Sequence, residues 1–225
     1  MSIPARSVDI YIVHLLERFE RLSSCYQQFK SSMLIDSLHI VTTEQPPISR
    51  FFADPPSTCE LPGYVPRKLR AAEKSVFYKH AYAIRNIANR DTSGGIILED
   101  DVVVENTAFH KFLYNLRNTN ILEDYDLVYF GNGAHEQNPS DTGVLGIVKP
   151  NHTLHKSKCA DSYVVSKKAA VRITQDYMHY PPFLPVDWDM SLRIMRYGLR
   201  VGWLQPGITF QGSQRGMFRS LIQDT

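Results

Sequence analysis

The chain has 225 residues, of which 43% are hydrophobic, and its formal net charge at pH 7 is +2. A chain of this length can bury the core of one domain, so we expect a single domain over residues 1–225. The charge is close to zero and no cluster of lysine and arginine stands out, which argues against a nucleic-acid partner. No apolar stretch is long enough to span a bilayer, so no transmembrane segment is expected.

The cysteines and the N-terminal residues indicate the compartment. Cys25, Cys59 and Cys159 are odd in number and show neither CxxC nor Cys/His ligand spacing, which is typical of free thiols in a reducing environment. The stretch from Met1 to Ser7 lacks the apolar segment of a secretory signal. We therefore expect a soluble, cytoplasmic protein.

Short apolar runs that suit buried strands alternate with segments whose apolar residues recur every three or four positions. The predicted strands are Asp9–Leu15, Ser37–Thr43, Ile96–Val103, Asp126–Phe130, Val144–Val148, Tyr163–Ser166, Val201–Leu204 and Ile208–Gln211. The predicted helices are 15–33 (apolar positions Leu15, Phe19, Leu22, Tyr26, Phe29 and Met33), Leu69–Ile87, Ala108–Leu116, Lys167–Tyr177 and Asp187–Tyr197. The proline-rich stretch Glu44–Pro66 is predicted as a long loop. This alternation predicts an α/β fold with a mainly parallel sheet flanked by helices.

Glu99, Asp100 and Asp101 form the most informative motif, because three consecutive carboxylates follow the apolar run Gly94–Leu98. Like charges at the end of a buried strand repel one another and lose water, unless a cation shares the site. Oxygen ligands suit Mg²⁺ or Mn²⁺, which commonly also bind substrate phosphates. The alternative is structural, since Asp and Glu after a strand also serve as turn residues or helix caps.

Five segments, in chain order, resemble glycosyltransferase family 25, the group of lipooligosaccharide and collagen galactosyltransferases. They are Ile12–Leu15 with Arg18 and Arg21, Ala72–His80, Ile97–Val102, Asp161–Ala170 and Pro185–Trp188. The Glu-Asp-Asp segment matches the family's metal-binding strand end without a change, whereas His14 stands where the family has asparagine.

This resemblance implies a GT-A fold, a single nucleotide-sugar-binding domain that uses Mn²⁺ or Mg²⁺ to bind a nucleoside-diphosphate sugar, here expected to be UDP-linked. The acceptor would be a hydroxyl of a glycan or glycolipid. Asp101 is the expected metal ligand, and Glu99, on the same face of an extended strand, would reach metal-bound water or the ribose. Asp100 would point the other way unless a turn intervenes. Asp100, His80, Arg18 and Gln211 are further candidates for donor binding, although a histidine on the apolar face of a helix is more often a core residue.

An inverting transferase, as this family implies, needs a general base to take the proton of the acceptor hydroxyl. Asp187 and Asp189 are the candidates, and only Asp187 lies in the Pro-x-Asp motif. Both precede an amphipathic run, so the alternative is a helix N-cap.

Two other functional classes remain open. A sugar nucleotidyltransferase would also need clustered carboxylates, but it should have a glycine-rich phosphate loop near the first strand, and Val13–Arg18 contains no glycine. A non-catalytic glycan-binding or assembly module would need no metal cluster.

Overall fold

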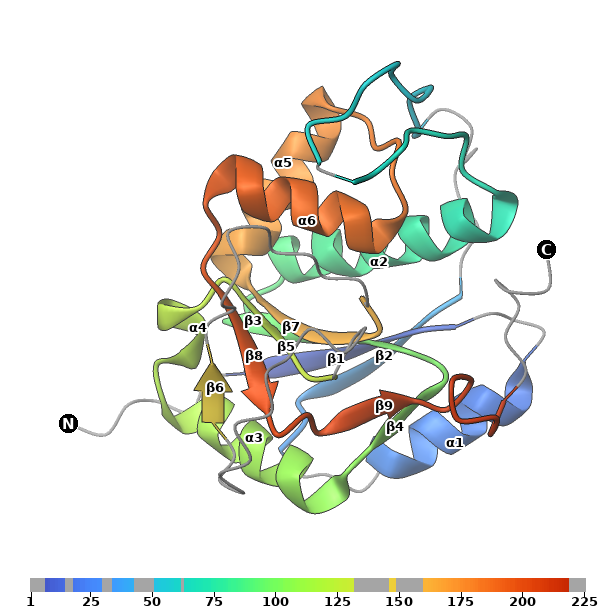
Figure 1. Ribbon diagram of the computed structural model, residues 1–225. Helices are drawn as coiled ribbons and strands as arrows, with labels where there is room; N and C mark the ends of the chain where they lie inside the picture. The colour runs from blue at the N-terminus through green and yellow to red at the C-terminus, as the bar shows by residue number, and fades with distance from the viewer. Residues whose placement is uncertain are drawn as a thin grey trace.

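A computed structural model describes residues 7–14, 18–29, 34–42, 51–61, 63–131, 146–148 and 160–218. Its centre is a seven-stranded sheet in the order β2-β1-β3-β7-β5-β8-β6 (Figure 1). The strands are β1 (Val8–Val13), β2 (Ser37–Val41), β3 (Gly94–Glu99), β5 (Leu127–Tyr129), β6 (Gly146–Val148), β7 (Ser162–Ser166) and β8 (Val201–Gln205). A second, two-stranded sheet pairs β4 (Val102–Val104) with β9 (Thr209–Gln211).

The sheet is mixed but mainly parallel in direction. β1 is parallel to both β2 and β3, and β5 is parallel to β8. β7 is antiparallel to its neighbours β3 and β5, and β6 is antiparallel to β8. Five of the seven strands therefore run the same way, which confirms the predicted α/β class. Because β7 is reversed, it begins at the edge where the parallel strands end.

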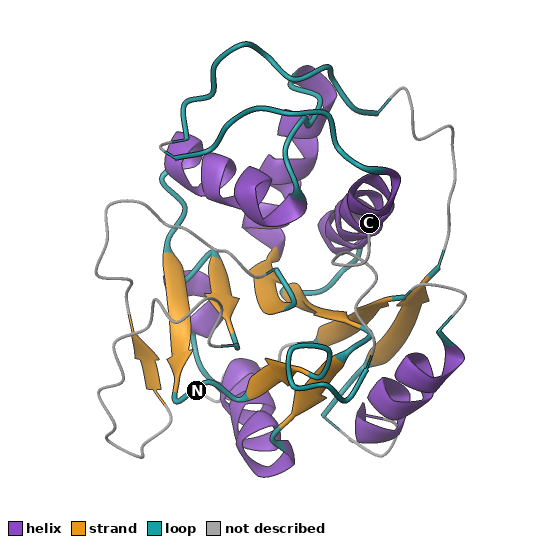
Figure 2. Cartoon of the chain, turned by 45° about the vertical axis from the view of Figure 1, so that its right-hand side comes forward, coloured by secondary structure: helices purple, strands orange, loops and turns teal. Residues whose placement is uncertain are grey.

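Helices cover both faces of this sheet (Figures 1 and 2). One face carries α2 (Ala71–Asn89), α5 (Lys167–His179) and α6 (Val186–Tyr197). The other carries α1 (Phe19–Phe29), α3 (Asn106–Asn118) and the short α4 (Ile121–Asp124), which the sequence pattern did not predict. Two buried apolar clusters, one on each face, fill the space between the helices and the sheet.

Glycine lets α2 pack closely against β3. A Cβ atom at Gly95 would lie 2.6 Å from two side-chain carbons of Ile87, and one at Gly94 would lie 2.5 Å from the carbonyl oxygen of Val165. Larger residues would push the helix or the neighbouring strand away. Gly95 thus sets the distance between α2 and β3, and Gly94 sets the approach of β7 to the same strand.

The buried face of α1 differs from the predicted apolar stripe. Phe19 is 74% exposed and Tyr26 is 42% exposed, whereas Arg21, Cys25 and Phe29 are buried. The prediction was right for Phe29 and wrong for Phe19 and Tyr26, because it counted apolar residues alone and ignored the buried ion pair that Arg21 forms with Asp100. Leu15 and Met33, the ends of the predicted stripe, lie outside the described residues, as does Cys159.

The predicted strand Ile96–Val103 is in fact two strands. β3 ends at Glu99, Asp100 and Asp101 form a turn, and β4 pairs in the second sheet with β9. The described part of the predicted 44–66 loop (51–61 and 63–66) contains neither helix nor strand, as its prolines predict. Within the described residues, no helix combines the length and the apolar character needed to cross a membrane.

A buried polar network joins α6 to α5. Arg193 forms ion pairs with Asp189 on its own helix and with Asp176 of α5, and the hydroxyl of Tyr177 donates to Asp189 at 3.1 Å. Tyr197 also donates to Asp176. Arg193, Asp176 and Asp189 are each at most 5% exposed. This network fixes the orientation of α6 against α5.

Replacing Arg193 by methionine should cost about 3–5 kcal/mol of unfolding free energy, because two buried carboxylates lose their cation. Urea unfolding of Arg193→Met would measure the loss. Arg200→Met is the matched control, since Arg200 is paired with Asp126 but 48% exposed, and an exposed pair contributes at most about 1 kcal/mol. Equal losses in the two variants would contradict a dominant role for the buried network.

Candidate functional site

The candidate site lies at the edge where β1 and β3 end and β7 begins. Val13 is the register partner of Glu99, so the last residues of these parallel strands are neighbours. The amide of Glu99 donates to the carbonyl of Asp161 at 2.8 Å, which brings the residue before β7 to the same place. Clustering of strand ends at one edge is the usual location of ligand sites in open α/β sheets.

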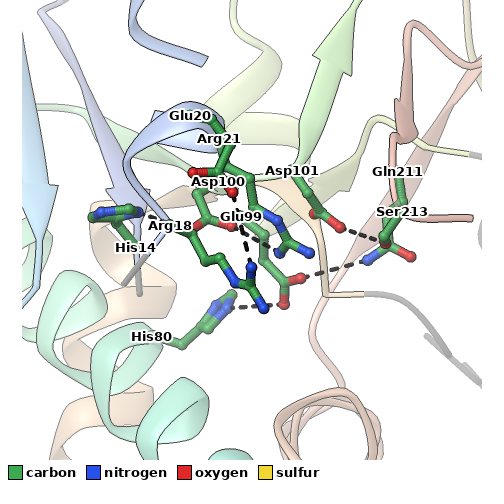
Figure 3. A network of polar contacts seen from close by, with 10 residues as sticks. All are labelled: His14, Arg18, Glu20, Arg21, His80, Glu99, Asp100, Asp101, Gln211 and Ser213. Carbon is green, nitrogen blue, oxygen red and sulfur yellow. Dashed lines mark hydrogen bonds and ion pairs between the residues drawn. The ribbon is translucent and has the colours of Figure 1, made fainter. Parts of the chain in front are cut away.

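Asp100 turns towards α1 (Figure 3). Its carboxylate lies 2.8 Å from Nδ1 of His14 and 3.4 Å from a guanidinium nitrogen of Arg21. All three side chains are at most 6% exposed. Strand alternation does not set this direction, because Asp100 lies in a turn, which is the case in which the expected alternation does not apply.

Glu99 faces α2 and β9. Its Oε1 lies 3.6 Å from Nε2 of His80, and Nε2 of Gln211 donates to its Oε2 at 3.4 Å. Burial lowers the pKa of His80 to about 3, so the imidazole is neutral, and 3.6 Å is too long for a hydrogen bond. The contact is therefore not an ion pair. His80 is instead held by Tyr163, whose hydroxyl lies 3.0 Å from its Nδ1.

Asp101 is held from the C-terminal side. The Ser213 hydroxyl donates to its Oδ2 at 2.5 Å, and the Gly212 amide donates to its carbonyl at 2.8 Å. Its Oδ1 is buried and has no hydrogen-bond partner among the described residues. Asp101 thus keeps one oxygen available for a ligand.

Asp161 is a further carboxylate that the sequence analysis did not assign to the site. It is 4% exposed, and Ser162 donates to its Oδ1 at 3.2 Å. Burial, with the charges of Glu99 and Asp101 adding to it, raises the pKa of Asp161 to about 8. Burial and neighbouring carboxylates likewise raise the pKa of Glu99, and burial raises that of Asp101. These groups are therefore short of positive charge.

The donor set fits a hard divalent cation. Glu99 and Asp101 offer carboxylate oxygens, the unpartnered Oδ1 of Asp101 among them. Burial raises the pKa of both groups and neighbouring carboxylates add to it, and a bound cation would offset both effects. Among the described residues, however, no three His, Cys, Asp or Glu side chains are grouped closely enough to hold a metal ion by themselves. A cation at this edge would need further oxygen ligands from a phosphate or from water.

The two candidate bases occupy different surroundings. Burial raises the pKa of Asp187 to about 6, and the charge of Glu99 contributes. This carboxylate therefore lies within electrostatic range of Glu99, which together with Asp101 and Asp161 forms what we call the acidic edge. Neither residue is the N-cap, because Pro185 holds that position and Asp187 accepts from the amide of Trp188. Asp189 points into the network with Tyr177 and Arg193.

The structure thus brings together Glu99, Asp100, Asp101, His80 and Gln211, with Asp187 nearby and Asp189 apart. Arg18 points towards this group from the start of α1 (Figure 3), and its nearest ionic partner is Glu20 at 3.9 Å. Sequence analysis missed the contacts of Arg21, Ser213 and Asp161. Arg21 and Asp161 lie within the quoted motifs, so their positions were available as a signal, whereas nothing local marks Ser213.

No family model matches the chain, and no curated protein matches it. Similar solved structures include a glycosyltransferase involved in the glycosylation of the major capsid of PBCV-1 (11% identity, TM-score 0.42, covering 76% of this chain and 64% of that one). Another is CMP:2-keto-3-deoxy-manno-octonic acid synthetase complexed with CTP (12% identity, TM-score 0.47, 97% and 99%). A third is the galactosyltransferase LgtC in complex with donor and acceptor sugar analogs (13% identity, TM-score 0.45, 87% and 72%). Likeness at this level assigns neither a family nor an activity to the chain.

The raised pKa of Asp161 predicts how stability changes with pH. The folded protein keeps this carboxyl protonated up to pH 8 or so, whereas the unfolded chain loses the proton near pH ~4. Stability should therefore fall as pH rises between these values, because the unfolded state binds fewer protons there. Asp161→Asn removes this titration, so the variant should melt close to wild type at pH ~4 and above it at pH ~8.

Circular dichroism melts in chelator-containing buffer across this range would measure the effect. A variant that is less stable than wild type at every pH would mean that the protein needs the ionised carboxylate of Asp161 as an acceptor.

Proposed function

We propose that this protein is a metal-dependent, inverting glycosyltransferase that moves a sugar from a nucleoside-diphosphate donor, expected to be a UDP-sugar, to a hydroxyl of a glycan or glycolipid. The observation that carries this proposal is the grouping of Glu99, Asp101 and Asp161 at the ends of β3 and β7, with Asp187 within electrostatic range. The five segments that resemble glycosyltransferase family 25 support the same activity, and a GT-A fold with them.

The acidic edge would hold Mn²⁺ or Mg²⁺ through Asp101, with Glu99 as a second contact. When bound, the cation supplies a Lewis acid that stabilises the negative charge on the departing diphosphate. Gln211 and Ser213 orient the two carboxylates, and Arg21 offsets the charge of Asp100 from the side of α1. His80 is neutral, so its role would be to shape the pocket beside Glu99 and not to supply charge.

Asp187 would take the proton of the attacking acceptor hydroxyl. A pKa of about 6 keeps this carboxylate ionised at neutral pH and makes it a stronger base than an exposed aspartate. Asp187 lies in the first turn of α6, which the Arg193 network holds against α5. Asp187 would therefore lie on a rigid helix, which holds its carboxylate in the position that proton transfer requires.

The first test is metal-dependent nucleotide binding. UDP should bind more tightly with Mn²⁺ than with EDTA, and Asp101→Asn should remove that difference while leaving the metal-free fold intact, because the amide keeps the shape but loses the ligand charge. Calorimetry measures both affinities. Asp100→Asn is the matched control, since this carboxylate faces His14 and Arg21. This variant should lower the stability of the fold, and UDP should still bind it more tightly with Mn²⁺ than with EDTA.

Equal UDP affinity with Mn²⁺ and EDTA would remove the metal from the proposal. A product assay separates the remaining enzyme class: release of nucleoside diphosphate from a sugar nucleotide supports a glycosyltransferase. Release of pyrophosphate from a nucleoside triphosphate and a sugar substrate would assign a nucleotidyltransferase instead.

The second test concerns the base. Asp187→Asn should leave donor binding nearly unchanged and lower turnover by roughly 10²-fold or more. In the wild type, turnover should fall as pH drops below about 6, where Asp187 becomes protonated, and this acid limb should be absent from the variant.

Asp189→Asn provides the comparison two residues along the same helix. It should destabilise the protein through the Arg193 network and leave the turnover of folded enzyme near normal. The opposite result, with normal turnover in Asp187→Asn and collapse in Asp189→Asn, would move the base to Asp189. Normal turnover in both would exclude both carboxylates.

A further inference from the structure

A groove of about 840 Å³ lies between α2 and α5, and its volume is in the range of small-molecule sites. The two helices are antiparallel, because α2 leads into β3, and the amide of Lys167, the first residue of α5, donates to the carbonyl of Ser93 at 2.9 Å. The end of α2 therefore lies beside the start of α5. None of the residues assigned to the acidic edge lines this groove.

One end of the groove is aromatic and apolar. Phe51 packs edge-on against Tyr78 and Tyr177, with ring centroids 5.7 and 5.9 Å apart, and all three line the groove with Met178. Met178 is 79% exposed, and Tyr82, further along α2, is 43% exposed. Exposed apolar side chains grouped around a groove indicate a binding surface.

The other end of the groove is basic. Arg85 lines it and is exposed. Lys168, also exposed, precedes Val171, Gln175 and Met178 by three, seven and ten residues, so it lies on the groove side of α5. Both helices are described over their whole length, and neither carries an exposed acidic side chain, because Glu73 and Asp176 are buried. The two helices therefore make the groove apolar at one end and basic at the other, and the exposed Asp91 follows the end of α2.

We propose that this groove binds an anionic phospholipid at a membrane surface, with an acyl chain against Phe51, Tyr78 and Met178 and the phosphate headgroup at Arg85 and Lys168. Charge complementarity favours a negative headgroup, since the positive end has no acidic side chain from either helix to compete for it. The amphipathic aromatic side chain of Tyr82 suits the boundary between acyl chain and headgroup. This surface would hold the protein at a membrane whether or not the acidic edge is catalytic.

The test is cosedimentation of the full chain with vesicles of phosphatidylglycerol mixed into phosphatidylcholine, and with phosphatidylcholine vesicles alone. Binding should be stronger to the anionic vesicles by at least about tenfold and should weaken with salt. The variant R85E/K168E should remove this preference, and Met178→Glu should weaken binding to both compositions. Hydrogen exchange should slow in α2 and α5 when anionic vesicles are added, without any mutation.

The matched control is K111E/Y114E on α3, which covers the other face of the sheet, and where Lys111 is exposed and Tyr114 is 59% exposed. This variant should bind vesicles like wild type. Absence of binding to anionic vesicles, equal binding to both compositions, or equal loss in the α3 variant would each overturn the proposal. A dimer in solution that Met178→Glu dissociates, without vesicle binding, would assign the groove to a second copy of the chain instead.

Discussion

The crowding of carboxylates at the end of β3 is the constraint on which the site depends. Burial raises the pKa of Glu99, Asp101 and Asp161, and the charges of Glu99 and Asp101 raise that of Asp161 further. Arg21 acts on all three residues of the Glu-Asp-Asp motif. It pairs with Asp100, and its positive charge reduces the rise in the pKa values of Glu99 and Asp101. The need for positive charge beside these carboxylates explains why α1 buries Arg21 and leaves Phe19 in solvent. A bound cation would offset the negative charge that the guanidinium of Arg21 offsets only in part.

Much of the fold could be predicted because each strand is a short apolar run with polar or glycine boundaries. β7 and β8 lie within one residue of their expected limits. The division of Ile96–Val103 into β3 and β4 could not be predicted, because Val102–Val104 is as apolar as the strand before it. The turn at Asp100 and Asp101, together with pairing to Thr209–Gln211, distant in sequence, separates the two strands.

The sequence predicts those site residues that are consecutive in the chain. It does not predict those that only the folding of the sheet brings together. Asp161 stands alone in the sequence, and only the reversed direction of β7 places it beside Glu99. Asp187 and Asp189 were equivalent on spacing, but two residues on a helix differ in direction by about 200°. One carboxylate therefore lies within range of the acidic edge and the other enters the contact with α5.

The pairing of β4 with β9 also sets the order in which the site can assemble during synthesis. Gln211 and Ser213 each contact a carboxylate 112 positions earlier in the chain. A ribosome that has released β1 to β3 has exposed the acidic residues long before the segment that orients them exists. The turn at Asp100 and Asp101 must therefore wait, with Asp100 held by His14 and by Arg21 of α1, until nearly all of the described chain has emerged. Premature termination just before β9 would leave every strand of the large sheet in the polypeptide and the acidic turn without its second support.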